Sequence, residues 1–234
     1  MRVRRIAVLI DGSFFLRRLP KLVPAHSCTT PEQIADWARI LCRRHVQRIT
    51  RSSIKRDAGC LWLDHVYRLF YYDAAPYDGV SHHPVLNRRI EFDKSGTAVF
   101  RRRLFSELRR QRKFALRLGN VIKEDEWRLS SRLTRQVLRI EKWLEQFEAH
   151  RTEDGAKARR TIGDSHVREL EGILATWRKI GEQDVQLELR QKGVDMRIGL
   201  DIASMTLKCQ VDTIVLVTGD SDRPATTRFR HGDN

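Results

Sequence analysis

The chain lacks a long hydrophobic run, and this absence argues against a membrane-spanning helix. No stretch approaches the roughly 20 consecutive apolar residues that a helix needs to cross a bilayer. The first apolar run extends only from Ile6 to Ile10 and stops at Asp11. Although basic residues precede this run, it is too short for the core of a secretory signal peptide. We therefore expect neither a membrane anchor nor a signal peptide.

Cysteine is scarce, and its spacing fits neither a disulfide framework nor a zinc site. The four cysteines, Cys28, Cys42, Cys60 and Cys209, form no Cys-x-x-Cys pair. Such thiols are typical of reducing compartments, so we expect a cytoplasmic protein with reduced cysteines. The Gly-x-Gly-x-x-Gly and phosphate-loop motifs are also missing, so no motif supports a nucleotide-binding protein.

Basic residues, in contrast, are in excess. Lys and Arg number 45 against 30 for Asp and Glu, which gives a formal net charge of +15, and most of the excess is arginine. The planar guanidinium group matches phosphate oxygens, and a surface of this charge attracts polyanions, most simply nucleic acid. The alternative is that the charge only keeps the protein in solution.

The pattern of apolar residues predicts an α/β fold. Short apolar strands are expected at residues 5–10, 66–72, 185–189 and 213–218. A helix should begin with Thr30 as N-cap, Pro31 in the first turn and Gln33 closing a capping box, and end near Ile49. A second helix is expected over residues 195–208. Strands that alternate with helices favour a mostly parallel sheet with helices on both faces.

The middle of the chain has helical periodicity. Apolar stripes at three- and four-residue spacing run from Phe100 to Leu108, from Leu133 to Phe147 and from Val167 to Trp177. With 234 residues, the chain is long enough for one domain with an insertion. We therefore expect a single domain over residues 1–234, in which residues 97–181 form a helical elaboration.

Four acidic residues follow the predicted strands. Asp11 comes after the first strand, Asp195 after the third, and Asp220 and Asp222 after the fourth. Ligands of open parallel sheets bind beyond the carboxyl ends of the strands. Four carboxylates gathered there would repel one another unless a hard cation such as Mg²⁺ or Mn²⁺ bound between them. Each acid alone is equally explained as a helix cap or turn residue, and Asp73 is better explained as a turn residue.

A basic helix is the candidate phosphate-binding surface. The side chains that we expect to contact phosphate groups of a nucleic acid are Arg101, Arg102, Arg103, Arg109, Arg110 and, just before Asp195, Lys192. The alternative is that these side chains are merely solvated. A basic surface around an acidic, metal-holding cleft is the layout of a nuclease, in which the metal activates water and polarises the phosphoryl group. Ser13 lacks the carboxylate that a haloacid-dehalogenase-type phosphatase needs there, and Phe15 breaks the Asp-x-Ser-x-Ser pattern of a metal-dependent adhesion site.

Five short motifs resemble those of a known family. They are Ile10-Asp11-Gly12, Tyr71-Tyr72-Asp73, Phe114-Ala115-Leu116-Arg117-Leu118-Gly119, Gln191-Lys192-Gly193-Val194-Asp195 and Thr218-Gly219-Asp220-Ser221-Asp222. Together they resemble the NYN domain, in particular its bacterial LabA branch, a relative of PIN-domain ribonucleases. The resemblance implies a PIN-like three-layer α/β/α sandwich and metal-dependent cleavage of RNA. It places Asp11, Asp195, Asp220 and Asp222 at the metal site, supported by Ser13, Thr218 and Ser221.

The end of the chain differs from the family pattern. Family members usually continue after the last motif with Phe, a helix and a further strand, whereas here Arg223 follows and the chain ends at Asn234. We therefore expect the last helix–strand unit of the sheet to be missing. An unpaired strand edge would remain, through which copies of the chain could associate. A non-catalytic RNA-binding or regulatory protein on a shortened PIN-like scaffold remains the alternative to a ribonuclease.

Overall fold

The computed structural model describes residues 5–51, 60–135, 138, 164–219 and 226–228. These residues belong to two compact units. The first unit combines residues 1–79, 91–122 and 190–234, and the second combines residues 80–90 and 123–189. The first unit contains Asp11, Asp195 and the ends of the predicted strands at residues 5–10, 66–72 and 213–218.

Strands and helices alternate along most of the chain. The strands are β1 (Ile6–Asp11), β2 (Val66–Ala74), β3 (Val80–His83), β4 (Arg88–Glu91), β5 (Phe114–Leu129), β6 (Val185–Lys192), β7 (Thr213–Val217) and β8 (Thr226–Arg228). The α-helices are α1 (Gly12–Arg18), α2 (Pro31–Thr50), α3 (Gly96–Arg110), α5 (Asp164–Trp177) and α6 (Val194–Leu207). Short 3₁₀ helices are η1 (Leu19–Lys21), η2 (Ala25–Ser27), η3 (Cys60–His65), η4 (Phe92–Lys94) and η5 (Glu182–Asp184).

The central sheet has six strands in the order β6-β5-β2-β1-β7-β8. Strand β1 lies between β2 and β7 and is parallel to both, and β2 is parallel to β5. Residues 6–10 of β1 are fully buried, as expected for a strand covered on both faces. The predicted α/β class with a mostly parallel sheet is therefore confirmed.

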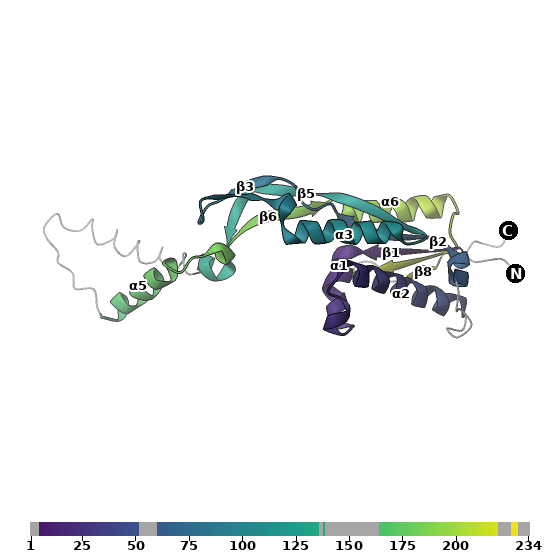
Figure 1. Cartoon of the computed structure of the whole chain (residues 1–234), viewed down its shortest axis with the longest axis horizontal. Helices are drawn as coiled ribbons and strands as arrows, with labels where there is room; N and C mark the ends of the chain where they lie inside the picture. Colours follow the sequence, from purple (N-terminus) through teal and green to yellow (C-terminus); the bar gives the residue numbers. More distant parts are fainter. Residues whose placement is uncertain (1–4, 52–59, 136–137, 139–163, 220–225, 229–234) are drawn as a thin grey trace. The chain divides into compact units, whose positions relative to one another are not determined.

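Each face of the sheet in the first unit has its own apolar core. Ile6, Val8 and Ile10 pack with side chains of α1, α2 and α3 on one face. Ala7 and Leu9 pack on the other face with side chains of α6. Figure 1 shows α2 and α6 on opposite sides of the strands. Alternation along β1 thus builds three layers, with helices covering both faces.

Helix α2 forms where the sequence predicts it. The Thr30 side chain accepts a hydrogen bond from the Gln33 backbone N–H, and the Gln33 side chain accepts one from the Thr30 backbone N–H. Pro31 occupies the first turn, where a missing N–H is tolerated. The helix ends at Thr50, followed by Arg51 in the left-handed conformation. The four predicted strands are also present and correspond to β1, β2, β6 and β7. The predicted helix after the third of these strands is α6.

The expectation of a wholly helical segment over residues 97–181 is wrong at β5. Helix α3 accounts for the first apolar stripe, but the chain then leaves the helical conformation, and Lys113 has a φ of 68°. From Phe114 the apolar side chains alternate, with Leu116 and Leu118 packed against one core and Ala115 against the other. A two-residue period is typical of a strand. The alternating stretch is short and directly follows a longer helical stripe, which dominates the sequence pattern.

The second unit contains the two-stranded sheet β3-β4 and helix α5. Helix α5 coincides with the third predicted apolar stripe, but two of the stripe residues, Leu174 and Trp177, are not buried. Leu174 and Trp177 are 55% and 47% exposed, whereas Ile173 is 8% exposed. Of the second predicted stripe only Leu133 belongs to the described residues, and it is buried. The single-domain assignment over residues 1–234 stays a prediction.

A short strand follows β7 in the region where we expected no further unit of the sheet. Strand β8 pairs antiparallel with β7 through residues 226–228. Strand β8 therefore covers the edge of β7, and in the described part of the chain the outer strands of the sheet are β6 and β8. Association of copies through a sheet edge stays a prediction. No helix among the described residues is long and apolar enough to span a bilayer.

Candidate functional site

The carboxyl ends of β1 and β2 bring two acidic residues close together. Asp11 ends β1 and pairs in register with Tyr72, the residue before Asp73 on β2. The Asp11 side chain also caps α1, because its Oδ1 accepts a hydrogen bond from the backbone N–H of Phe14 at 3.1 Å. Asp11 thus has the capping role that any isolated aspartate at a helix start would have, and it lies beside a second carboxylate.

Gly12 allows the chain to turn directly from β1 into α1. A Cβ atom at this position would lie 2.5 Å from Cε1 of Tyr71 and 2.8 Å from the carbonyl oxygen of Tyr72. Both distances are shorter than van der Waals contact. Only glycine therefore lets the Asp11 turn pack this closely on β2.

Asp73 is a fully buried carboxylate, which makes it more than a turn residue. Its Oδ1 accepts hydrogen bonds from the Arg101 guanidinium of α3 and, at 2.8 Å, from the backbone N–H of Ala74. Burial raises the pKa of the Asp73 carboxyl, Arg101 opposes this shift, and the Asp11 carboxylate adds to it. Its Oδ2 is buried and has no hydrogen-bond partner among the described residues. Asp73 therefore adds a second carboxylate to this edge, and one of its oxygens has no hydrogen-bond partner among the described residues.

A chain of hydrogen bonds connects this edge to the end of β6. The Ser13 hydroxyl donates to Oε1 of Gln191 at 3.1 Å, and Nε2 of Gln191 lies 3.5 Å from Oδ1 of Asp73. The segments after β1 and at the end of β6 are thus held at the end of β2. Gln191 and Asp73 were not among the predicted site residues. Both residues carry a signal in the sequence, because Asp73 follows an apolar run and Gln191 begins the motif that contains Asp195.

Asp195 lies in the first turn of α6, directly after β6. Its side chain is exposed, and the helix begins after Gly193, whose φ is 81°. The carbonyl oxygen of Lys192 approaches Gly119 of β5 so closely that a Cβ there would lie 2.4 Å from it. Since Gly119 pairs in register with Ala74, the start of α6 is held at the carboxyl end of β2. Lys192 itself is exposed.

The fourth predicted strand end lies next to α1. A Cβ at Gly219 would lie 2.4 Å from Cδ2 of Phe14, so the chain after β7 passes directly over the first turn of α1. Thr218 is half-buried and has an interaction partner. Asp220, Ser221 and Asp222 lie outside the described residues. Among the residues that are described, no group of three or more His, Cys, Asp or Glu side chains is placed to hold a metal ion.

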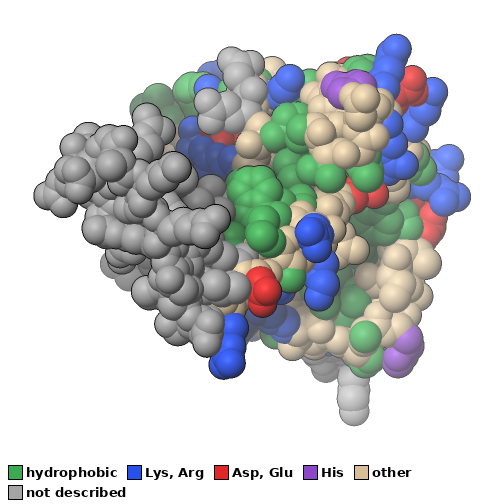
Figure 2. Space-filling model, turned by 90° about the vertical axis from the view of Figure 1, so that its left-hand side faces the viewer, with side chains coloured by type: hydrophobic (Ala, Val, Ile, Leu, Met, Phe, Trp, Pro, Cys, Tyr) green, Lys and Arg blue, Asp and Glu red, His purple; other side chains and the backbone are tan. Residues whose placement is uncertain are grey.

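The predicted basic surface on α3 has two kinds of arginine. Arg101 is 21% exposed and forms an ion pair with the buried Asp73, and its expected contact with RNA stays a prediction. Arg102 donates to the Asp93 carbonyl, and Arg110 pairs with Glu107 at 2.8 Å. Arg103 and Arg109 are exposed. On the face shown in Figure 2, Lys and Arg side chains form separate patches among apolar and other groups.

Comparisons with known proteins leave the chain without an assigned family. No family model, curated protein or solved structure matches it.

Proposed function

We propose that this chain is a metal-dependent ribonuclease of the PIN-like type, related to the NYN domains of the LabA branch. Its substrate would be RNA, and its cofactor Mg²⁺ or Mn²⁺. The observation that carries the proposal is the meeting of Asp11 and Asp73 at the carboxyl ends of two adjacent parallel strands. This end of an open parallel sheet is where ligands bind.

The oxygen ligands available there suit a hard divalent cation. Asp11 and Asp195, together with Asp220 and Asp222, would hold the ion, and the unpaired Oδ2 of Asp73 is a further oxygen at the same edge. When bound, the ion polarises a phosphoryl oxygen and lowers the pKa of a coordinated water. A bound cation also relieves the repulsion between neighbouring carboxylates.

Other residues of the edge would hold the acids and the substrate in place. Asp73 acts as a positioning residue, because its contacts with Arg101 and Gln191 tie α3 and β6 to the end of β2. Ser13 fixes Gln191 through its hydroxyl group. The exposed guanidinium groups of Arg103 and Arg109 are free to contact phosphates, and Thr218 and Ser221 flank the last acidic motif.

A non-catalytic RNA-binding protein is the second candidate, and one observation favours it. The Arg101 guanidinium already neutralises the carboxylate that lies beside Asp11. A site that carries its own counter-ion has less need of a metal. This candidate predicts binding of RNA without cleavage.

The test is cleavage of labelled single-stranded RNA in the presence of Mn²⁺. The variants are Asp11→Asn and Asp195→Asn, and the control is Asp64→Asn, an exposed acid before β2 at the opposite end of the strand. Asparagine also caps helices, so Asp11→Asn removes the charge while keeping the cap. Loss of outer-shell groups alone typically costs about 10- to 100-fold, so we expect both site variants to lose more than about 100-fold in rate.

The control variant should cleave like the unmodified protein. Equal cleavage by all four proteins would assign the activity to a contaminant and reject the ribonuclease. Binding of RNA without cleavage by the unmodified protein would support the second candidate instead.

A further inference from the structure

An apolar pocket of ≈270 Å³ lies in the first unit beside α1, η1 and α2. Its walls are the aromatic side chains Phe14, Phe15 and Trp37 and the aliphatic side chains Leu19, Leu41 and Val217. The only polar group of Trp37, the indole N–H, donates to the Ser27 carbonyl at 2.9 Å. The ring therefore offers the pocket only apolar surface.

The pocket is open to solvent on an apolar side. Leu22 and Ile40 line it, and they are 68% and 37% exposed. Contiguous apolar surface left in water is unfavourable, and in soluble proteins such a patch commonly marks a binding site. The apolar lining thus favours a ligand that is itself largely apolar.

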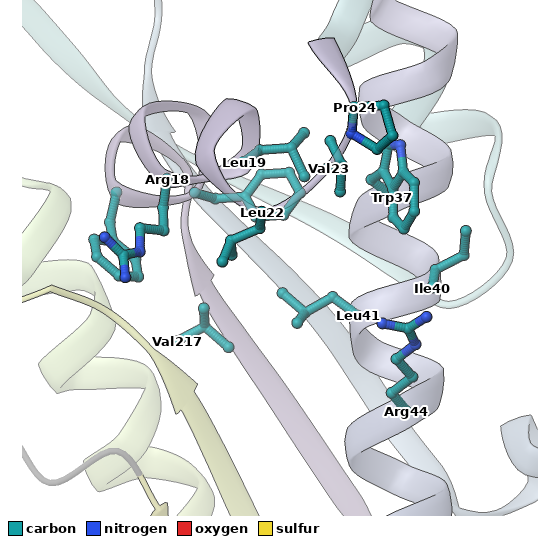
Figure 3. A pocket seen from close by; sticks show the side chains of 12 residues that line it. Arg18, Leu19, Leu22, Val23, Pro24, Trp37, Ile40, Leu41, Arg44 and Val217 are labelled. Atoms are coloured by element: carbon teal, nitrogen blue, oxygen red, sulfur yellow. The ribbon is translucent and has the colours of Figure 1, made fainter. Parts of the chain in front are cut away.

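Two arginines flank the apolar surface. Figure 3 shows Arg18 and Arg44 on opposite sides of the pocket, with Leu22 and Leu41 between them. Both are exposed, and neither has an ion pair with any acid in the described part of the chain. The neighbouring Arg17 differs, because its guanidinium donates to the Ser13 carbonyl. The two guanidinium groups at the pocket are thus available to an oxyanion, for which their planar geometry is well suited.

We propose that this pocket binds a small amphipathic anion, namely an aliphatic chain with a terminal carboxylate or phosphate. The chain lies between Phe15, Trp37 and Leu41, and the anionic head is bound by Arg18 or Arg44. A nucleobase fits less well, because the apolar walls leave its donors and acceptors without partners, which is costly. Binding of such a ligand at the pocket does not depend on RNA cleavage at the acidic edge.

The test is isothermal titration of the full chain with monomeric decanoate and with decyl phosphate, which distinguish the two head groups. Acetate serves as a head without a tail, and decanol as a tail without a charge. We expect binding of at least one of the two anionic amphiphiles, weaker binding of decanol and none of acetate. An Arg18→Gln/Arg44→Gln variant should bind at least about tenfold more weakly, because it loses the charged hydrogen bond to the head group.

Two further variants separate this site from non-specific attraction. Arg39→Gln/Arg48→Gln removes the same charge from exposed positions of α2 that do not line the pocket, and it should bind normally. Leu22→Asp places a repelling charge at a largely exposed position, so folding persists while binding is lost. The proposal is overturned if neither amphiphile binds, if decanol binds as tightly as they do, if both arginine pairs have equal effects, or if Leu22→Asp still binds. In a parallel titration with anionic lipid vesicles, binding of the protein to the vesicles but to neither monomeric amphiphile would also overturn the proposal.

Discussion

The guanidinium group of Arg101 forms an ion pair with the carboxylate of Asp73, which has no exposed surface. This contact joins α3 to the end of β2, beside the acid that ends β1. It assigns Arg101, which the sequence places in a run of surface arginines, to the interior of the candidate site. Removing the charge of Arg101 or Asp73 should therefore also change the free energy of unfolding.

Replacing Arg101 should destabilise the protein more than replacing its neighbours. Arg101→Met keeps much of the side-chain volume but leaves a buried carboxylate unpaired, which typically costs about 3 kcal/mol. Arg103→Met, at an exposed position, should change the unfolding free energy by less than about 0.5 kcal/mol. Urea unfolding measures both.

The cost of Arg101→Met should also depend on pH. Burial already raises the pKa of Asp73, and losing Arg101 raises it further. Since the folded state then holds the proton more tightly than the unfolded state, stability falls as pH rises above the ordinary pKa of an aspartate. The variant should be closer to the unmodified protein at pH 4 than at pH 8, and equal losses at both values would contradict the buried pair.

Gly12 should tolerate no side chain. In Gly12→Ala the new Cβ meets Tyr71 and the Tyr72 backbone, and overpacking of this kind typically costs about 1–3 kcal/mol. The matched change Gly199→Ala lies inside α6 with nothing within 4 Å, so it should be neutral or stabilise by up to about 1 kcal/mol. Opposite shifts in thermal unfolding are expected, and similar shifts would contradict the close packing of the Asp11 turn.

His45 should make the protein less stable in mild acid. Burial lowers its pKa, and the nearby Arg48 adds to the effect. The unfolded chain therefore binds a proton more readily, and stability is lost as pH falls below about 6.5. His45→Gln should reduce this loss between pH 7.5 and 5.5, measured by urea unfolding, whereas His26→Gln at an exposed position should not. The same slope in both variants would reject the assignment.

Arg103 and Arg109 should contribute to RNA affinity. Replacing both with Gln removes two phosphate contacts, so the slope of log affinity against log salt for single-stranded RNA should decrease by about 1.4. The measurement is a filter-binding or anisotropy titration at several salt concentrations. Arg39→Gln/Arg48→Gln removes the same charge from α2, and an equal effect of both pairs would mean that only net charge matters.

Local signals made much of the fold predictable. The capping box at Thr30 and Gln33 fixes the start of α2, and the uninterrupted apolar runs of β1 and β7 pair in register. The sequence does not predict β5, because the apolar alternation over residues 114–118 is short and follows a strong helical stripe. The position of Asp11 beside the end of β2 follows from the same patterns, since the parallel strands β1 and β2 share one carboxyl edge.

The contacts that build the site could not be predicted in the same way. The pairing of Asp73 with Arg101 spans 28 residues, and that of Ser13 with Gln191 spans 178. Both depend on how α3 and β6 pack onto the sheet, which no local pattern encodes. A run of arginines looks uniform in sequence, although only some of its members face the solvent.

The most direct test of the metal site is the binding of Mn²⁺ to the full chain, measured by electron paramagnetic resonance. We predict that the unmodified protein and Asp64→Asn bind the ion alike, and that Asp11→Asn and Asp195→Asn bind it at least about tenfold more weakly. Equal binding by all four proteins, or none by the unmodified one, would contradict a metal site at the carboxyl edge of the sheet.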